Sequence, residues 1–199
     1  MTKNPADLQA GLESDDNLMA RVGKGDAVAF ETLYGRWSRR VMAYAFRALS
    51  DKGEAEDVVQ ETFLSVFRAS SRYRPCERFG AFLFRIAGNA VRSRIRRKCP
   101  IPLDFSEGEE EESRFPSDTE GDWTHFEERE RLHAALETLP FPQRNALLLA
   151  VTGGLSYREI ALQEGISEDA VAARICRARK ALRKALAASG CEEEEKVDA

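Results

Sequence analysis

The sequence has few of the residues on which metal sites and disulfide frameworks depend. Its 199 residues include four cysteines and two histidines. The cysteines form no CxxC pair and follow no signal-like N-terminus, so we expect a reducing, cytoplasmic setting and no disulfide framework. The histidines and Cys99 lack the spacing of metal ligands, which predicts solvated or packed histidines and no metal. These residues are Cys76, Cys99, Cys176, Cys191, His125 and His133.

Long apolar runs and catalytic motifs are also missing. No run approaches the roughly 20 apolar residues that a membrane-spanning helix needs, so we expect a soluble protein without membrane insertion. No nucleophile–base pair, phosphate-binding glycine loop or metal cluster is recognisable. The sequence therefore predicts a protein that is not an enzyme and needs no cofactor.

Charge divides the chain into segments that the net value of −4 conceals. Residues 15–97 hold 16 Lys and Arg against 10 Asp and Glu, residues 98–125 hold 2 against 9, and residues 126–190 hold 10 against 8. Phosphate binding depends on local charge, so the acidic average does not exclude nucleic acid. We expect an all-α protein with a flexible leader (1–14), a helical domain (15–97), an acidic flexible linker (98–125), a second helical domain (126–187) and an acidic tail (188–199).

The linker allows two interpretations: a disordered tether, or an acidic strand that imitates nucleic acid in a basic channel.

Residues 155–186 have the pattern of a helix-turn-helix motif. Ser156 and Glu159 form a capping box at the start of the first helix, which we expect to end near Glu164. Gly165 suits the left-handed turn that stops it, and Ser167 caps the second helix. The sequence therefore predicts two short helices joined by a tight turn.

The second helix of this motif separates into two faces at about 100° per residue. Apolar residues point inward, namely Val171, Ile175, Ala178, Leu182 and Leu186. The opposite arc carries small residues first and cations later: Ala172, Ala173, Cys176, Arg177, Lys180, Arg183 and Lys184, with Arg174 at the edge. Small side chains admit base edges, and later cations meet phosphates, so the helix suits a DNA major groove. The alternative is a basic amphipathic helix with a solvated face.

The helix expected over residues 54–70 also has two faces. Its core face holds Val58, Val59, Thr62, Phe63, Val66 and Phe67, and the other holds Asp57, Gln60, Glu61, Leu64 and Arg68. An apolar residue at the centre of a polar stripe is typical of a protein-docking surface, although an ordinary solvated face explains the same residues.

A basic loop and an arginine-rich helix follow. Residues 71–78 contain Tyr73 and Pro75, and they suit either the stacking of single-stranded bases or simple turn chemistry. The next helix, over residues 79–98, gathers arginines that point to phosphate. We expect them on its outer surface: Arg85, Arg92, Arg94, Arg96 and Arg97.

Together these segments resemble the extracytoplasmic function (ECF) sigma factors, small two-domain specificity subunits of bacterial RNA polymerase. The resemblance covers about residues 15–97 and 126–187. Residues 55–63 (AEDVVQETF) are similar to the family's AEDLVQETFL, and residues 82–89 (FLFRIAGN) to its WLFRIARN. Leu139-Pro140, Gln143-Arg144 and the segments LSYREIA and RICRARKALR also match.

The resemblance implies roles for the surfaces described above. Asp57, Gln60, Glu61 and Leu64 would contact the β′ clamp coiled coil of core polymerase, and the second domain would meet the β flap. The single-stranded −10 element would be held by Tyr73, Arg74, Arg78, Asn89, Arg92 and Arg96. The duplex −35 element would meet Ser156, Tyr157, Arg158, Ala172, Ala173, Arg174, Cys176, Arg177 and Lys180.

The implied function is promoter recognition and stabilisation of promoter melting, under the control of an anti-sigma factor. Phe82 stands where the family usually has Trp, which keeps an apolar plug. Ala172 and Ala173 replace a pair that is often basic or hydroxylated, so the −35 sequence does not follow from the family. The competing interpretation is a helix-turn-helix repressor or activator whose residues 15–97 form a sensor domain.

Overall fold

A computed structural model describes residues 13–75, 78–98 and 123–194, with side chains for 13–75, 78–98 and 130–187. Within these ranges the chain forms eight α-helices and one 3-10 turn, and no strand, so the all-α prediction is confirmed. The helices are α2 (Asp15–Val22), α3 (Ala27–Leu49), α4 (Lys52–Ala69), η1 (Ser70–Arg72), α5 (Phe79–Lys98), α6 (Trp123–Glu137), α7 (Phe141–Val151), α8 (Tyr157–Glu164) and α9 (Glu168–Glu194). Most of the expected leader and linker lies outside the described residues.

Helices α2 to α5 form one packed group, the front group. Their boundaries follow from capping residues: Asp26 accepts hydrogen bonds from the backbone N–H groups of Val28 and Ala29 at the start of α3, and Asp51 accepts one from Glu54 at the start of α4. Helix α3 ends at Ser50, whose φ of 52° lies in the left-handed region. Residues within a few positions of each helix end therefore account for these boundaries.

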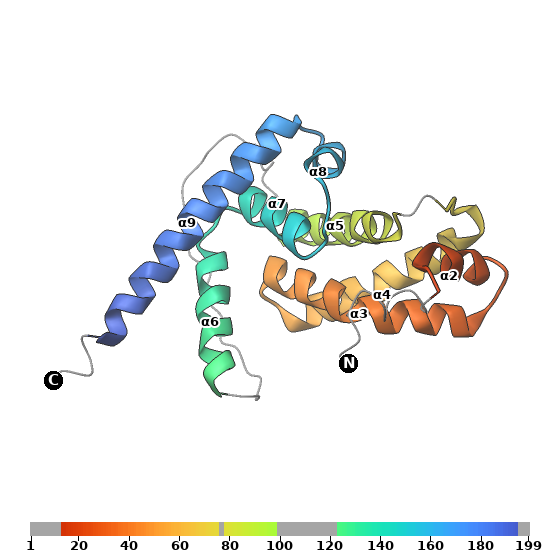
Figure 1. Cartoon of the computed structure of the whole chain (residues 1–199), viewed down its shortest axis with the longest axis horizontal. Helices are drawn as coiled ribbons and strands as arrows, with labels where there is room; N and C mark the ends of the chain where they lie inside the picture. The colour runs from red at the N-terminus through yellow and green to blue at the C-terminus, as the bar shows by residue number, and fades with distance from the viewer. Residues whose placement is uncertain (1–12, 76–77, 99–122, 195–199) are drawn as a thin grey trace, which may run out of the picture.

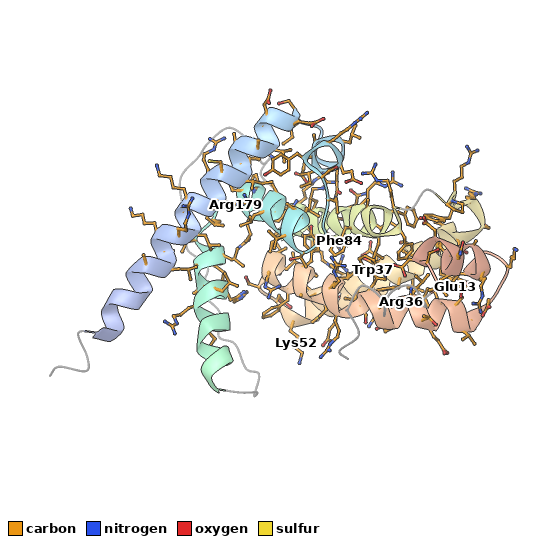
Figure 2. All side chains as sticks on the ribbon, viewed as in Figure 1. Glu13, Arg36, Trp37, Lys52, Phe84 and Arg179 are labelled. Atoms are coloured by element: carbon orange, nitrogen blue, oxygen red, sulfur yellow. The ribbon has the colours of Figure 1, made fainter. Side chains whose placement is uncertain are left out.

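Aromatic rings fill much of the front group. Phe63 of α4 packs against Phe30 and Tyr34 of α3, with ring centroids 6.2 and 4.7 Å apart. Phe84 of α5 meets Trp37 of α3 edge to face at 6.3 Å, and Figure 2 labels both residues at this contact. Helices α3, α4 and α5 thus all pack on one another.

Two side chains of the front group lie where the sequence pattern did not predict them. Phe67, expected in the core, is 51% exposed, and its ring meets Phe30 at the start of α3 edge to face at 5.5 Å. Arg94, expected on the outer surface, is buried between α5 and α4 and forms ion pairs with Glu54 at 3.0 Å and Glu61 at 2.8 Å. Periodicity alone assigned it to the wrong face because its neighbours are carboxylates of another helix.

Helices α6 to α9 form the rear group. Pro142 lies in the first turn of α7, where its missing N–H interrupts no hydrogen bond of the helix. Val171, Ile175 and Ala178 of α9 are buried, whereas Leu186, predicted to point inward, is 37% exposed. Helix α9 continues to Glu194, so residues 188–194 of the expected acidic tail are helical.

The two groups pack against each other, and one buried apolar cluster runs through both. Figure 1 shows α7 and α8 lying beside α5 and one end of α3, with α6 next to that end, while the second half of α9 extends away from the front group. None of the described helices is long and apolar enough to cross a bilayer. This packing brings α5 and α8 together, which the sequence did not predict.

Candidate protein and nucleic-acid interfaces

The outer face of α4 is open to solvent. Its four candidate residues are all exposed, and Leu64 is 55% exposed at their centre: Asp57, Gln60, Glu61 and Leu64. The ion pair with Arg94 holds the Glu61 carboxylate in place from below. Exposed Phe67 lies one turn beyond Leu64 and adds apolar area. We call this set, with Phe67, the docking face.

The helix-turn-helix geometry follows the predicted caps. The Glu159 backbone N–H donates to Ser156 Oγ at 3.4 Å, and the Ser156 backbone N–H donates to Glu159 Oε2 at 2.8 Å. Gly165 ends α8 with a φ of 70°, a left-handed conformation that is unfavourable for most residues other than glycine. The side chain of Ser167 then accepts a hydrogen bond from the Ala170 backbone N–H at 3.1 Å. Both predicted caps and the predicted turn are confirmed.

The exposed side of this motif contains most of the residues expected at the −35 element. Ser156, Tyr157, Arg158, Ala173, Cys176, Arg177 and Lys180 are exposed, and Ala172 is half-buried. Arg174 differs, because its side chain is only 12% exposed and its guanidinium lies 4.0 Å from the Glu164 carboxylate of α8. The structure therefore gathers seven of these residues on one surface and turns Arg174 toward the interior.

The residues expected at the −10 element lie on α5 and in the loop before it. An open hollow of about 400 Å³ is lined by Asn89, Arg92, Ser93, Arg96 and Arg97. Arg74 is exposed, and the Tyr73 hydroxyl donates to Asp16. Three arginines around one hollow suit the phosphates of a strand.

Part of this α5 surface is already occupied by α8. Arg92 donates to the Gln163 carbonyl at 2.6 Å, and its guanidinium lies 3.0 Å from the Glu164 carboxylate. Arg92 also donates to Asn89 Oδ1 at 2.5 Å. Arg78 forms an ion pair with Glu159 at the start of α8. Three of the six candidate −10 residues therefore form this cluster with α8.

Burial raises the pKa of the Glu159 carboxyl, but hydrogen bonds from Ser156 and the charge of Arg78 outweigh burial, so the net shift is downward.

A buried polar chain between the groups was missed at the sequence level. The Tyr44 hydroxyl of α3 donates to Asn145 Oδ1 of α7 at 2.7 Å, and Asn145 Nδ2 donates to Glu164 Oε1 at 3.0 Å. Tyr44 and Asn145 are fully buried. Burial, together with the charge of Glu164, raises the pKa of the Tyr44 hydroxyl far above its ordinary value, while Arg92 lowers it. The one available signal was a polar Asn145 directly before an apolar run.

His133 of α6 also crosses between the groups. Its ring stacks on Phe46 of α3 with centroids 4.9 Å apart and planes 10° apart. Burial lowers the pKa of His133; Arg144 and Arg47 lower it further, and Glu137 opposes them. Among the described residues no cluster of three His, Cys, Asp or Glu side chains has the arrangement of a metal site. The ring packs on Phe46 in this arrangement.

Two family models match the chain. Residues 33–99 match the model described as Sigma-70 region 2, and residues 129–182 match the model described as Sigma-70, region 4. The first covers most of the front group, and the second covers most of the rear group.

Individual relatives cover most of the chain. The RNA polymerase sigma-H factor of Pseudomonas aeruginosa is 32% identical over 182 residues, which span 87% of this chain and 94% of the relative. The ECF RNA polymerase sigma-E factor of Escherichia coli is 34% identical over 177 residues, spanning 85% and 92%. The solved structure of CnrH in complex with the cytosolic domain of CnrY matches with a TM-score of 0.64 at 28% identity, covering 88% of this chain and 99% of that one.

Proposed function

The chain belongs to the ECF sigma factors of the sigma-70 family, and from that premise we propose that it binds core RNA polymerase through the docking face and promoter DNA through α5 and the α8–α9 motif. It acts as a specificity subunit and catalyses no reaction itself. Its proposed place of action is the cytoplasm, together with the polymerase.

The observation that carries this assignment is the presence of two separate surfaces on one chain. The docking face lies on α4, and the exposed residues of the helix-turn-helix motif lie on the rear group. A repressor needs only the second surface, whereas a factor that recruits polymerase to DNA needs both. The exposed Leu64 and Phe67 favour a protein partner for α4, because buried apolar area stabilises protein interfaces.

Reading of the −35 duplex is assigned to the first half of α9. Exposed Ala173 and Cys176 are small enough for the helix to approach base edges, and Arg177 lies beside them. An arginine bridges guanine O6 and N7, and such a contact contributes about 1–3 kcal/mol of discrimination. Lys180, one turn later, is suited to a backbone phosphate.

Holding the −10 strand is assigned to α5 and the preceding loop. Tyr73 lies next to Phe82, with ring centroids 5.0 Å apart, and the arginine-lined hollow lies further along α5. Aromatic faces stack unpaired bases while arginines neutralise phosphates, so together they stabilise an opened strand. Unstacking costs a few kcal/mol per step, which these contacts and the polymerase would offset.

An anti-sigma factor is the proposed regulator. CnrH, which shares 28% identity and this fold, was solved in complex with the cytosolic domain of CnrY. Such a partner would cover surfaces that polymerase or DNA otherwise use.

Retention on immobilised core RNA polymerase tests the docking face. We expect Asp57→Ala with Gln60→Ala to reduce retention at moderate salt by tenfold or more, since interface centres concentrate binding energy. Glu31→Ala on exposed α3 is the control and keeps wild-type retention. Equal retention of all variants contradicts the assignment, and a repressor would not be retained at all.

Run-off transcription on genomic fragments with core enzyme tests the DNA surface. Arg177→Ala is expected to reduce promoter-specific transcripts and to relax the preference at one −35 position. Arg179→Ala, on the same helix but about 200° away, is the matched control. An unchanged transcript profile for Arg177→Ala removes Arg177 from the interface.

A further inference from the structure

We propose that Arg94 of α5 is a positioning residue for polymerase binding: it holds the carboxylate of Glu61 on the docking face in the orientation that meets a basic side chain of the partner. This inference rests on the function proposed above and describes how its α4 surface works. Arg94 acts through Glu61, because its own side chain is buried between α5 and α4 and is only 8% exposed.

The Arg94 guanidinium is paired with two carboxylates of α4. Its Nη1 donates to Glu61 Oε2 at 2.8 Å and to the Ala90 carbonyl at 3.3 Å. Its Nε lies 3.0 Å from Glu54 Oε2. A charge in the interior of a protein is stable only when it is paired. The two acids of α4 therefore keep this cation inside the front group, and the cation in turn fixes the acids.

Glu61 belongs both to this buried pair and to the surface. Its side chain is 52% exposed, although Oε2 is bound from the inner side by Arg94. An exposed glutamate that lacks such a contact samples many rotamers, and ordering it at an interface costs free energy. Folding has already ordered this side chain. The partner therefore meets a carboxylate whose position is set before binding.

Glu54 anchors Arg94 from the side away from the docking face. It lies in the first turn of α4, where the Lys98 ammonium at the end of α5 approaches it at 3.7 Å and approaches Asp51 at 3.8 Å. The Arg94 guanidinium thus divides its charge between two carboxylates. Because the division is incomplete on each side, Glu61 keeps part of its negative charge toward solvent.

The exposed side of Glu61 suits a cationic group. An ionised carboxylate has about four acceptor positions, so Glu61 can accept from an arginine or lysine of the partner while Arg94 remains bound. Exposed Asp57 lies one turn earlier and adds a second acid, and Leu64 lies three residues later and adds apolar area. The docking face therefore combines fixed negative charge with an apolar centre.

Arg94 has two opposing effects on such a contact. Its positive charge weakens the attraction between Glu61 and a cation of the partner, whereas its hydrogen bond removes the cost of ordering Glu61. The charge effect acts at a half-exposed carboxylate, where solvent and salt screen it. The ordering effect is not screened. Removal of Arg94 therefore weakens binding to the partner.

A double-mutant cycle on the full chain tests the proposal, with binding to immobilised core RNA polymerase followed by biolayer interferometry. Arg94→Met keeps the buried aliphatic stem without the charge, and Arg94→Lys keeps the charge without the planar guanidinium. Both are made in the wild type and in Glu61→Ala, which has no carboxylate to position. Arg39→Met, at an exposed arginine of α3, is the matched control.

The expected result is a loss that depends on Glu61. Arg94→Met should weaken binding about threefold to tenfold, through faster dissociation, and Arg94→Lys should have an intermediate effect. In the Glu61→Ala background the same substitutions should change affinity by less than about twofold. Arg39→Met keeps wild-type affinity. Circular dichroism verifies that each variant keeps its helices, and Arg94→Lys carries the cycle if Arg94→Met does not fold.

Three other results lead to different conclusions. Equal losses in the wild-type and Glu61→Ala backgrounds would mean that Arg94 acts through the fold of α4, which overturns the positioning role. Unchanged or tighter binding by Arg94→Met overturns it as well, because charge neutralisation would then be the main effect of Arg94. Failure of the wild type to bind core polymerase overturns the proposed function, and the role of Arg94 with it.

Discussion

The outer faces of α4 and α5 differ in what covers them. Both helices belong to the front group, and both carry residues assigned to macromolecular contacts. The α4 face stands in solvent with Leu64 55% exposed, whereas Arg92 on the α5 face is paired with Glu164 of α8. Two surfaces of one domain therefore differ in exposure: the α4 face is open to solvent, whereas part of the α5 face is already paired with α8.

The difference has a simple physical origin. The α4 face exposes apolar side chains, and their burial by a partner would be favourable. The α5 face is rich in cations, which an intramolecular acid can neutralise while no phosphate is present. The rear group supplies that acid from α8. Three pairs of variants and one pH series test this packing through the free energy of unfolding. They follow in order of decreasing effect.

Replacing Phe84 of α5 or Phe67 of α4 by alanine is expected to give the largest difference in stability. Phe84→Ala removes a fully buried ring that packs on Trp37 and Tyr44, and it should lower the free energy of unfolding by about 3–5 kcal/mol. Phe67→Ala should lower it by about 1 kcal/mol or less, because half of that ring is already in solvent. Urea denaturation measures both, and equal losses would mean that Phe84 is not buried in solution.

Replacing Tyr44 or Tyr34 by phenylalanine is expected to give the next largest difference in stability. Tyr44→Phe leaves Asn145 Oδ1 buried without its donor, which should cost about 1–3 kcal/mol of unfolding free energy. Tyr34→Phe, at a residue that is 44% exposed, should change it by less than about 0.5 kcal/mol. Denaturation curves of the two variants decide the point, and a neutral Tyr44→Phe would show that the buried chain is hydrated.

Replacing Ser156 at the start of α8 or Ser93 of α5 by alanine should give a smaller difference in stability. Ser156→Ala removes the capping box of α8 and should lower the free energy of unfolding by about 1 kcal/mol. Ser93→Ala, at an exposed position inside α5, should be neutral or slightly stabilising because alanine favours the helix. Thermal unfolding followed by circular dichroism measures both changes. A stability loss in Ser93→Ala instead would mean that the hollow on α5 is structural.

The smallest effect concerns pH. Burial lowers the pKa of His133 below its ordinary 6.5, so the unfolded chain takes up the proton more readily than the folded chain. The stabilising contribution of the neutral ring is complete above pH 6.5 and is lost as the pH falls through the lowered value. Glu137 faces the ring as the opposing charge, and Arg144 and Arg47 add to the shift.

The matched variant is His133→Phe, which keeps an aromatic ring on Phe46 but cannot titrate. Thermal unfolding from pH 7.5 to pH 5 should show a steeper loss in the wild type than in this variant. Parallel curves would mean that His133 is exposed in solution and that α6 does not pack on α3.

Local sequence was sufficient for the helices and for the exposed stripe on α4. Capping at Ser156 and Ser167, the turn at Gly165 and the stripe on α4 depend on neighbours within four residues, and all appear as expected. The resemblance to ECF sigma factors, which the family models and relatives bear out, also came from contiguous motifs. The site residues assigned from that resemblance stay predictions until the experiments above are done.

Packing between helices decided what periodicity could not. Arg94 and Phe67 were assigned to the wrong faces because a helical wheel contains no information about which neighbour lies beyond each arc. Arg174, placed at the edge of the DNA face, lies against Glu164 for the same reason.

The sequence by itself determined an all-helical chain with a capped helix-turn-helix motif and an exposed polar stripe on α4, since these features arise from contacts between residues close in the chain. Only the tertiary structure decided that Tyr44 meets Asn145, 101 positions away, and that Arg92 meets Glu164, 72 positions away. Such pairs form when whole helices bury their apolar faces together, and the polar groups carried along must then find partners. No local sequence pattern predicts which distant residues become partners in this way.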